Sequence, residues 1–164
     1  MGIRQWPASS ARMSVAIQPA VTRDVPHVAA IEVSAFADPW SARAFHDALA
    51  NPAVYFACAH GDAGRIVGYV VAWFAGGEGE IANIAVVNDA WGTGVGGALL
   101  DAAIEHGAQR GAAMVFLEVR ESNQRARQLY QSRGFDEVGR RRDYYRNPRE
   151  DAIVLRRTIQ ELRV

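Results

Sequence analysis

A short glycine-rich stretch is the strongest constraint on what this chain can fold into. Four of the six residues from Gly92 to Gly97 are glycine, and they separate a strand-like run from a helix-like run in "NIAVVNDAWGTGVGGALLDAAIEHG" (residues 83–107). Successive glycines let backbone N–H groups point inward without obstruction by a Cβ atom, and the following helix start adds partial positive charge. Such a loop suits an anion such as a diphosphate. The alternative is a close strand–helix contact that needs small residues for packing alone.

The same glycines match a dinucleotide-binding pattern by their spacing. Gly92, Gly94 and Gly97 spell G-x-G-x-x-G, and Glu118 follows 21 residues after the last of them. In the dinucleotide fold the first glycine follows its strand almost at once, whereas residues 88–91 intervene here. Only 67 residues follow Gly97, which leaves little room for a second nucleotide-binding half. A nicotinamide site is therefore the disfavoured interpretation.

The composition predicts one globular domain. The chain has 164 residues, of which 49% are hydrophobic and 22% charged, and a domain of this size buries roughly 70% of its unfolded surface. We expect residues 1–14 to form a flexible N-terminal extension and residues 15–164 to form a single domain. No apolar run approaches the ~18 residues of a membrane helix, and the N-terminus has no apolar signal core. We therefore expect no membrane contact.

Cysteine and histidine usage limits the chemistry further. The single cysteine, Cys58, excludes an internal disulfide and fits a reducing cytoplasm. Because it lies in the apolar stretch "VYFACA", we expect it to be buried and inert. The four histidines show no metal-ligand spacing, so no metal is expected.

Charge is distributed unevenly, although the net charge is zero. Residues 1–119 contain 6 arginines and 11 acidic residues, residues 120–164 contain 12 arginines and 7 acidic residues, and there is no lysine. Arginine is suited to phosphate and carboxylate groups, so the C-terminal third could contact an anionic ligand or RNA. The alternative is a solvated surface in an arginine-biased protein. We expect no DNA partner.

Hydrophobic periodicity predicts an α/β fold with the element order β-α-α-β-β-β-α-β-α-β-β. Thr22 and Ser41 are expected to cap the first two helices, and Asn123 the last. We expect strands at residues 15–20, 53–60, 66–75, 81–87, 112–119, 135–143 and 151–157, and further helices from the glycine-rich stretch to about 107 and from 123 to about 133. This order predicts a central, mixed and mostly antiparallel sheet with helices on both faces.

The glycine motif resembles that of the GNAT superfamily of acetyl-coenzyme A-dependent N-acetyltransferases. That superfamily's diphosphate motif is Q/R-x-x-G-x-G/A, and Gly94 and Gly96 occupy its glycine positions. Within the superfamily, the chain resembles the ribosomal-protein-alanine N-acetyltransferases of the RimI type. The stretches that carry this narrower match are "FADPWS" (36–41), "FLEVRESNQRARQLYQSRGF" (116–135), "GRRRDYYRNP" (139–148) and "REDAIVL" (149–155). The resemblance extends from about residue 15 to residue 157.

The resemblance implies a GNAT-type fold and acetyl-coenzyme A (acetyl-CoA) as the acetyl donor. It implies that the coenzyme fills a gap between two splayed strands, residues 83–86 and 113–119. The implied coenzyme-binding residues are Ile84, Ala85, Val86, Gly92, Thr93, Gly94, Val95, Gly96, Gly97, Asn123 and Tyr130. The chain departs from the pattern at Trp91, where the motif has Gln or Arg. A side-chain contact to the diphosphate is lost there, while the backbone amides of the loop remain.

Glu118 and Tyr130 are the candidate catalytic residues. From the residues alone, Glu118 could equally form an ion pair with Arg120 at the end of its strand, and Tyr130 could be an ordinary core residue on a helix stripe. The resemblance implies that Glu118 is the general base and that Tyr130 is the general acid for the coenzyme thiolate.

The acceptor is expected between "FADPW" and "DYYRNP". Trp40, Tyr144 and Tyr145 offer aromatic walls there, and Asp38 offers a negative charge; packing of the three aromatic residues on the fold is the alternative. The resemblance implies that the acceptor is the α-amine of the N-terminal alanine of small-subunit ribosomal protein eighteen, which attacks the donor directly in a ternary complex. The alternatives are a GNAT enzyme that acetylates lysine side chains or a small amine, and a non-catalytic acetyl-CoA-binding module.

Overall fold

The computed structural model describes residues 11–159, which form one sheet and four α-helices in the predicted element order. The strands are β1 (Ala16–Pro19), β2 (Val54–His60), β3 (Ile66–Ala75), β4 (Glu78–Val86), β5 (Met114–Arg120), β6 (Asp136–Arg146) and β7 (Arg149–Thr158). The helices are α1 (Val25–Ala35), α2 (Ala42–Ala50), α3 (Val95–Gln109) and α4 (Gln124–Ser132), and three short 3-10 turns are η1 (Thr22–Asp24), η2 (Asp62–Gly64) and η3 (Asn88–Ala90). Residues 1–10 of the expected extension lie outside the described part.

The seven strands have the order β1-β2-β3-β4-β5-β7-β6. Only β4 and β5 are parallel, whereas the other neighbouring pairs are antiparallel. This confirms the predicted mixed and mostly antiparallel sheet. β4 starts at Glu78, three residues before the expected start. The reason is a two-residue turn at Gly76 and Gly77, both with positive φ, which lets β4 pair with β3 from its first residue.

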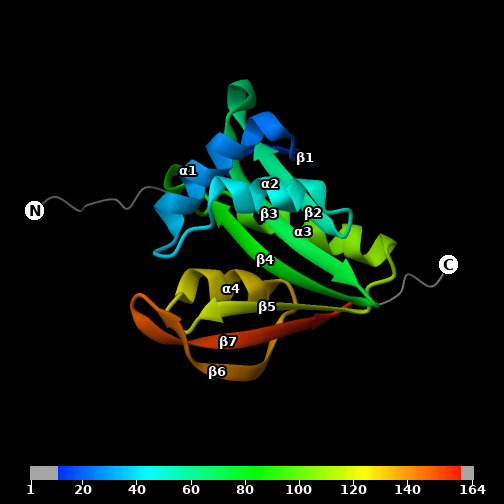
Figure 1. Ribbon diagram of the computed structural model, residues 1–164, viewed down its shortest axis with the longest axis vertical. Coiled ribbons are helices and arrows are strands. Elements are labelled where there is room, and N and C mark those ends of the chain that lie inside the picture. The colour runs from blue at the N-terminus through cyan, green and yellow to red at the C-terminus, as the bar shows by residue number, and fades with distance from the viewer. Residues whose placement is uncertain (1–10, 160–164) are drawn as a thin grey trace, which may run out of the picture.

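Helices cover both faces of the sheet, as predicted. In Figure 1, α1 and α2 lie over one face of β2–β4, and α3 lies behind the same strands. One hydrophobic cluster joins α1 and α2 to the sheet and includes Val28, Phe45 and Tyr69. A second cluster joins α3 and α4 to the other face and includes Leu99 and Tyr130. Both helical layers are therefore anchored to the strands that position the site.

Local signals explain most helix boundaries. The Ser41 hydroxyl accepts a hydrogen bond from the Ala44 N–H at 3.2 Å and caps α2, as expected. Thr22, by contrast, does not cap α1, because it starts the turn η1 and α1 begins only at Val25. The Asp24 carboxylate instead accepts a hydrogen bond from the Val21 N–H, which closes this turn.

The parallel strands β4 and β5 separate partway along their length. They pair from Glu78↔Met114 to Ile81↔Leu117 and no further. Beyond this point β4 continues beside β3, and β5 continues beside β7. Where the strands part, a bulge in β4 leaves Ala82 without a partner in β3, because Ile81 and Asn83 pair with consecutive residues of β3. Such a bulge bends its strand. Figure 1 shows the two strands diverging toward their C-terminal ends.

We predict that Leu99→Ala lowers the free energy of unfolding by about 2–5 kcal/mol, because a leucine without solvent exposure leaves a cavity when it is truncated. Chemical denaturation measures the change. As a control, Gln128→Ala on the exposed side of α4 should change the value by no more than about 0.5 kcal/mol. Equal losses in the two variants would contradict the described packing of α3.

Candidate active site

The glycine loop, residues 91–97, follows η3 and includes the first residues of α3. As the sequence predicts, η3 separates the loop from β4, unlike the tight turn of a dinucleotide fold. Gly92 and Gly94 have positive φ values of 74° and 93°. Residues that carry a Cβ atom rarely adopt this backbone conformation. The side chains of Thr93 and Val95 are buried, with 6% and 1% exposed. The Thr93 hydroxyl donates to the Ala90 carbonyl inside the protein, so neither of these side chains faces a ligand.

The start of α3 leaves backbone N–H groups for an anion. The first N–H groups of a helix have no intrahelical partner, and among the described residues no side chain caps α3 at Gly94. Gly96 and Gly97 serve packing instead. A Cβ atom at Gly96 would lie 3.1 Å from Leu129, and one at Gly97 would collide with the Arg133 guanidinium. The packing interpretation is thus confirmed for Gly96 and Gly97, whereas binding of a coenzyme diphosphate by the loop stays a prediction.

The C-terminal half of β4 presents backbone groups to the gap beside β5. The Val86 carbonyl accepts a hydrogen bond from the Trp91 indole at 3.0 Å, so this carbonyl points away from β3. Because alternate residues of a strand point their N–H and C=O groups to opposite edges, Ile84 also faces the gap. Ala85 turns its backbone toward β3. Of the three predicted coenzyme residues in β4, Ile84 and Val86 therefore turn backbone groups toward the gap, and Ala85 does not.

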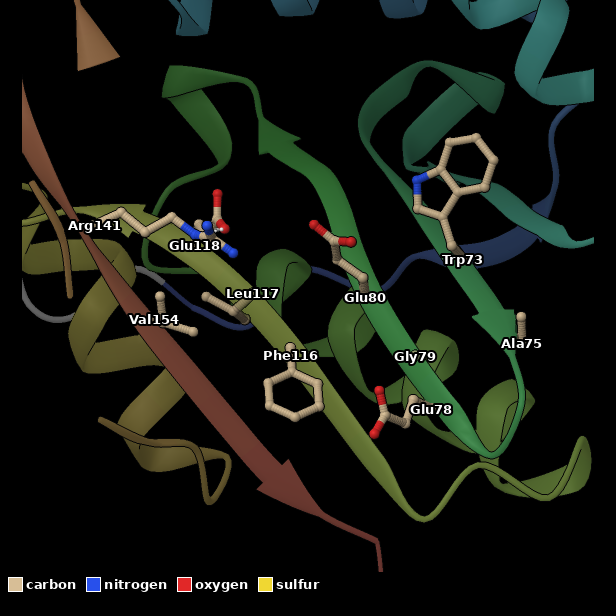
Figure 2. A pocket seen from close by; sticks show the side chains of 10 residues that line it. All are labelled: Trp73, Ala75, Glu78, Gly79, Glu80, Phe116, Leu117, Glu118, Arg141 and Val154. Atoms are coloured by element: carbon tan, nitrogen blue, oxygen red, sulfur yellow. Dashed lines mark ion pairs between the residues drawn. The ribbon is translucent and has the colours of Figure 1, made fainter. Parts of the chain in front are cut away.

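A groove of about 410 Å³ crosses the sheet next to this gap. It lies on the face that carries α1 and α2, beyond the area that these helices cover. Its lining residues are Trp73, Ala75, Glu78, Gly79, Glu80, Phe116, Leu117, Glu118, Arg141 and Val154. Figure 2 shows Glu80 of β4 and Glu118 of β5 on this face, with Arg141 beside Glu118. Three carboxylates and one guanidinium give the groove an acidic character that suits a cationic acceptor.

Glu118 forms its ion pair with Arg141, not with Arg120. The Arg141 Nε lies 2.6 Å from the Glu118 carboxylate, whose side chain is 18% exposed. The predicted alternative, a pair with Arg120, is wrong because the β6–β7 hairpin offers Arg120 other partners. Its guanidinium lies 3.3 Å from Glu150 and 4.3 Å from the ring centre of Tyr145. The Glu118 carboxylate thus faces the groove.

Glu118 acts electrostatically on the groups around it. Hydrogen bonding to Glu118, then burial, raises the pKa of the Tyr144 phenol. Burial raises the pKa of Glu80 most, and the negative charge of Glu118 raises it further. The positive charge of Arg141 lowers it. Burial and the same charge raise the pKa of Tyr145 to about 12. Glu80 therefore holds its proton to a higher pH than an ordinary glutamate.

Tyr130 and Asn123 lie at opposite ends of α4. The Asn123 side chain accepts a hydrogen bond from the Ala126 N–H at 3.2 Å and caps the helix, as predicted. Tyr130 packs in the core, with its ring 5.9 Å from that of Phe135. Burial raises the pKa of its phenol, which stays protonated at neutral pH. Tyr145 contributes to the same shift, which places it near both Tyr130 and Glu118.

The predicted acceptor residues fall into two groups. Tyr144 and Tyr145 lie beside Glu118, with their rings 5.1 Å apart. Trp40 packs 5.4 Å from Phe45 against the helical layer, and Asp38 is exposed; none of the four predicted acceptor residues lines the groove itself. The structure therefore brings only the two tyrosines next to the candidate base.

A buried glutamate that the sequence analysis missed holds the α1–α2 connection on the sheet. Glu32 is 1% exposed and accepts hydrogen bonds from the Trp40 N–H at 3.0 Å, the Asn83 amide at 2.7 Å and the Tyr69 hydroxyl. Asn83 lies next to the bulge of β4, so this network also fixes the place where β4 leaves β5. The available signal was an acidic residue on the apolar stripe of α1, four positions after Val28.

The single cysteine is not placed for chemistry at the groove. Cys58 is fully buried, as predicted, and burial raises the pKa of its thiol to about 12. Among residues 11–159, no group of three or more His, Cys, Asp or Glu side chains is placed to hold a metal ion. No helix in this part of the chain is long and apolar enough to cross a membrane.

Comparisons with known proteins agree with this geometry. Residues 25–135 match the model of the acetyltransferase (GNAT) family. The ribosomal protein bS18-alanine N-acetyltransferase of Escherichia coli is 37% identical over 136 residues, 82% of this chain and 90% of that protein. The N-alpha-acetyltransferase RimI of Mycobacterium tuberculosis is 38% identical over 145 residues, 84% of this chain and 89% of that protein. The crystal structure of the E. coli ribosomal-protein-S18-alanine enzyme superposes with a TM-score of 0.80 at 32% identity, over 92% of this chain and 99% of that one.

We predict that the pKa of Glu80 falls toward that of an ordinary glutamate in Glu118→Gln, because the variant removes a neighbouring negative charge. It should rise in Arg141→Ala, which removes a positive charge. Titration of the side-chain carboxyl carbon by NMR measures both changes. Shifts of the same sign in the two variants, or no shift in either, would contradict the described arrangement of the groove.

Proposed function

Since this chain belongs to the GNAT family of acetyltransferases, we propose that it transfers the acetyl group of acetyl-CoA to the α-amine of an N-terminal alanine, and that its acceptor is ribosomal protein bS18. The observation that carries this proposal is the parting of β4 and β5 after Ile81 and Leu117. One side of the gap carries the backbone of Ile84 and Val86 in β4, and the other side carries Glu118 of β5. The glycine loop lies beyond the C-terminal end of β4.

The acetyl donor supplies an activated thioester, and the protein supplies the contacts and the proton transfers. Backbone N–H groups of the glycine loop and of the first turn of α3 would hold the diphosphate. Backbone groups of Ile84 and Val86 would align the donor along β4. The direction of this edge supports the assignment, because the backbone of Ile84 and the Val86 N–H face the gap, while the Val86 carbonyl is already bonded to the Trp91 indole.

Glu118 would accept the proton of the acceptor ammonium. An α-amine with a pKa of about 8 is already ~10% neutral at pH 7, so that deprotonation costs only ~1.4 kcal/mol. A lysine side chain with a pKa of ~10.4 would cost over three times as much. One carboxylate is therefore better matched to a protein N-terminus than to lysine.

The acceptor has to replace Arg141 at the Glu118 carboxylate. The Arg141 side chain is 60% exposed, and an exposed ion pair contributes only about 0–1 kcal/mol. An incoming ammonium group can therefore displace it at little cost. Glu80 and Tyr144 lie beside the vacated position and would attract and align the cation.

Tyr130 would return a proton to the leaving thiolate. Its raised pKa keeps the phenol protonated in the resting enzyme. The same shift makes proton transfer to a thiolate of pKa ~8.5 more uphill. The transfer therefore requires close approach and stabilisation of the phenolate as it forms.

Acetylation of defined peptides tests the function directly. The purified protein is incubated with acetyl-CoA and a peptide that carries the N-terminal alanine of bS18, and mass spectrometry follows the product. A peptide with a blocked N-terminus and an internal lysine is the control. Acetylation of the free α-amine alone is the expected result. Acetylation of the lysine peptide, or of neither peptide, would contradict the proposal.

We predict that Glu118→Gln and Tyr130→Phe each lower kcat/KM for the alanine peptide by about 10²–10⁴-fold, the range typical of lost acid–base groups. Glu118→Gln should leave coenzyme affinity unchanged, since Glu118 would contact the acceptor. The matched control, Glu105→Gln on the exposed side of α3, should retain full activity. Equal activity in Glu118→Gln and the control would exclude Glu118 as the base.

A further inference from the structure

Trp91 stands where the family motif has Gln or Arg, and its surroundings explain how the chain can do without that side chain. The indole N–H donates to the Val86 carbonyl at 3.0 Å. This bond fixes the ring at the entrance of the glycine loop, where the side chain is 44% exposed. A large apolar ring that is held in place and still half open to solvent provides a surface for another group.

The group on that surface is the guanidinium of Arg125. Its Cζ lies 3.5 Å from the centre of the Trp91 ring, well within the range of a cation–π contact. Arg125 belongs to the first turn of α4, which follows the cap residue Asn123. The contact therefore joins the loop before α3 to the start of α4, across 34 residues of sequence.

One stripe of α4 faces the glycine loop and the start of α3. Arg125, Leu129 and Arg133 are spaced four residues apart and lie on one helix face. Leu129 and Arg133 are the side chains that a Cβ atom at Gly96 and at Gly97 would meet. The whole stripe thus lies along the loop, with an arginine at each end.

Of the two arginines, Arg133 has a carboxylate partner and Arg125 has none among residues 11–159. The Arg133 Nε lies 3.0 Å from the Asp101 carboxylate, which neutralises it. Arg125 forms no ion pair with any carboxylate of residues 11–159. A planar guanidinium that stacks on an aromatic ring keeps its N–H donors free at its edge. Arg125 therefore offers an unbalanced positive charge and free donors at the mouth of the loop.

We propose that Arg125, positioned by Trp91, binds the diphosphate of the coenzyme and replaces the cationic or amide side chain that the loop lacks. This inference rests on the proposed function, because it names a binding residue of the same site. Trp91 acts through Arg125 as a positioning residue. The departure from the family motif is thus a relocation of the side-chain contact from the loop to α4.

Calorimetric titration with coenzyme A and with dephospho-coenzyme A, which lacks only the 3′-phosphate, tests the proposal. Arg125→Ala should weaken the binding of both compounds by the same factor, about 10- to 100-fold, as expected for a charge-assisted hydrogen bond. The affinity of the variant should also depend less on salt than that of the wild-type protein. Arg125→Lys should recover part of the loss. Arg43→Ala, which removes an exposed charge on α2, is the control and should bind like the wild-type protein.

The role of Trp91 is tested by a double-mutant cycle. Trp91→Ala should weaken binding by about two- to fivefold, as expected for an exposed cation–π contact. The same change made in Arg125→Ala should have no further effect if Trp91 acts only through Arg125. An undiminished effect in that background would overturn the positioning role.

Three results would overturn the proposal for Arg125. They are wild-type affinity in Arg125→Ala, a loss confined to coenzyme A, and an equal loss for both compounds with unchanged salt dependence. A loss confined to coenzyme A would assign Arg125 to the 3′-phosphate. Wild-type protein that binds neither compound would contradict the proposed function itself, so the two failures are distinguishable.

Discussion

The site depends on the hydrogen bonds that β4 and β5 do not make. Two neighbouring parallel strands normally continue their pairing, because an unpaired backbone group inside a protein costs free energy. Here the pairing ends at Ile81 and Leu117, although both strands continue. The free edge of β4 is then available for a ligand. We propose that the coenzyme binds these groups and so completes the sheet where the pairing of β4 and β5 stops.

Several parts of the structure maintain this separation. The bulge at Ala82 bends β4, and the buried Glu32 holds Asn83 next to it. On the other side β7 pairs along the whole of β5, so β5 keeps its course without β4. The hairpin of β6 and β7 then brings Arg141 and Tyr144 to Glu118. The groove beside Glu118 is thus a consequence of the same arrangement.

The features that the sequence predicted are local ones. The caps at Ser41 and Asn123 and the loop conformation at Gly94 depend on residues within one turn, so composition and spacing were sufficient. The element order followed from hydrophobic periodicity. Family resemblance, not spacing, singled out Glu118 and Tyr130.

The features that the sequence missed join distant residues. The Glu32 network spans 37 and 51 positions to Tyr69 and Asn83, and no local pattern pairs Trp91 with Arg125. The alternative interpretation of Glu118, an ion pair with Arg120, is wrong for the same reason, since the carboxylate partner of Arg120 comes from another strand.

Amide hydrogen exchange, resolved by NMR with and without acetyl-CoA, tests the central claim that the coenzyme occupies the gap beside β4. We expect acetyl-CoA to slow exchange at Ile84, Val86 and the first turn of α3. Exchange at Ala85 should change little, because its backbone already faces β3. Slower exchange at Ala85 alone, or no change along β4 while the coenzyme is bound, would contradict the account.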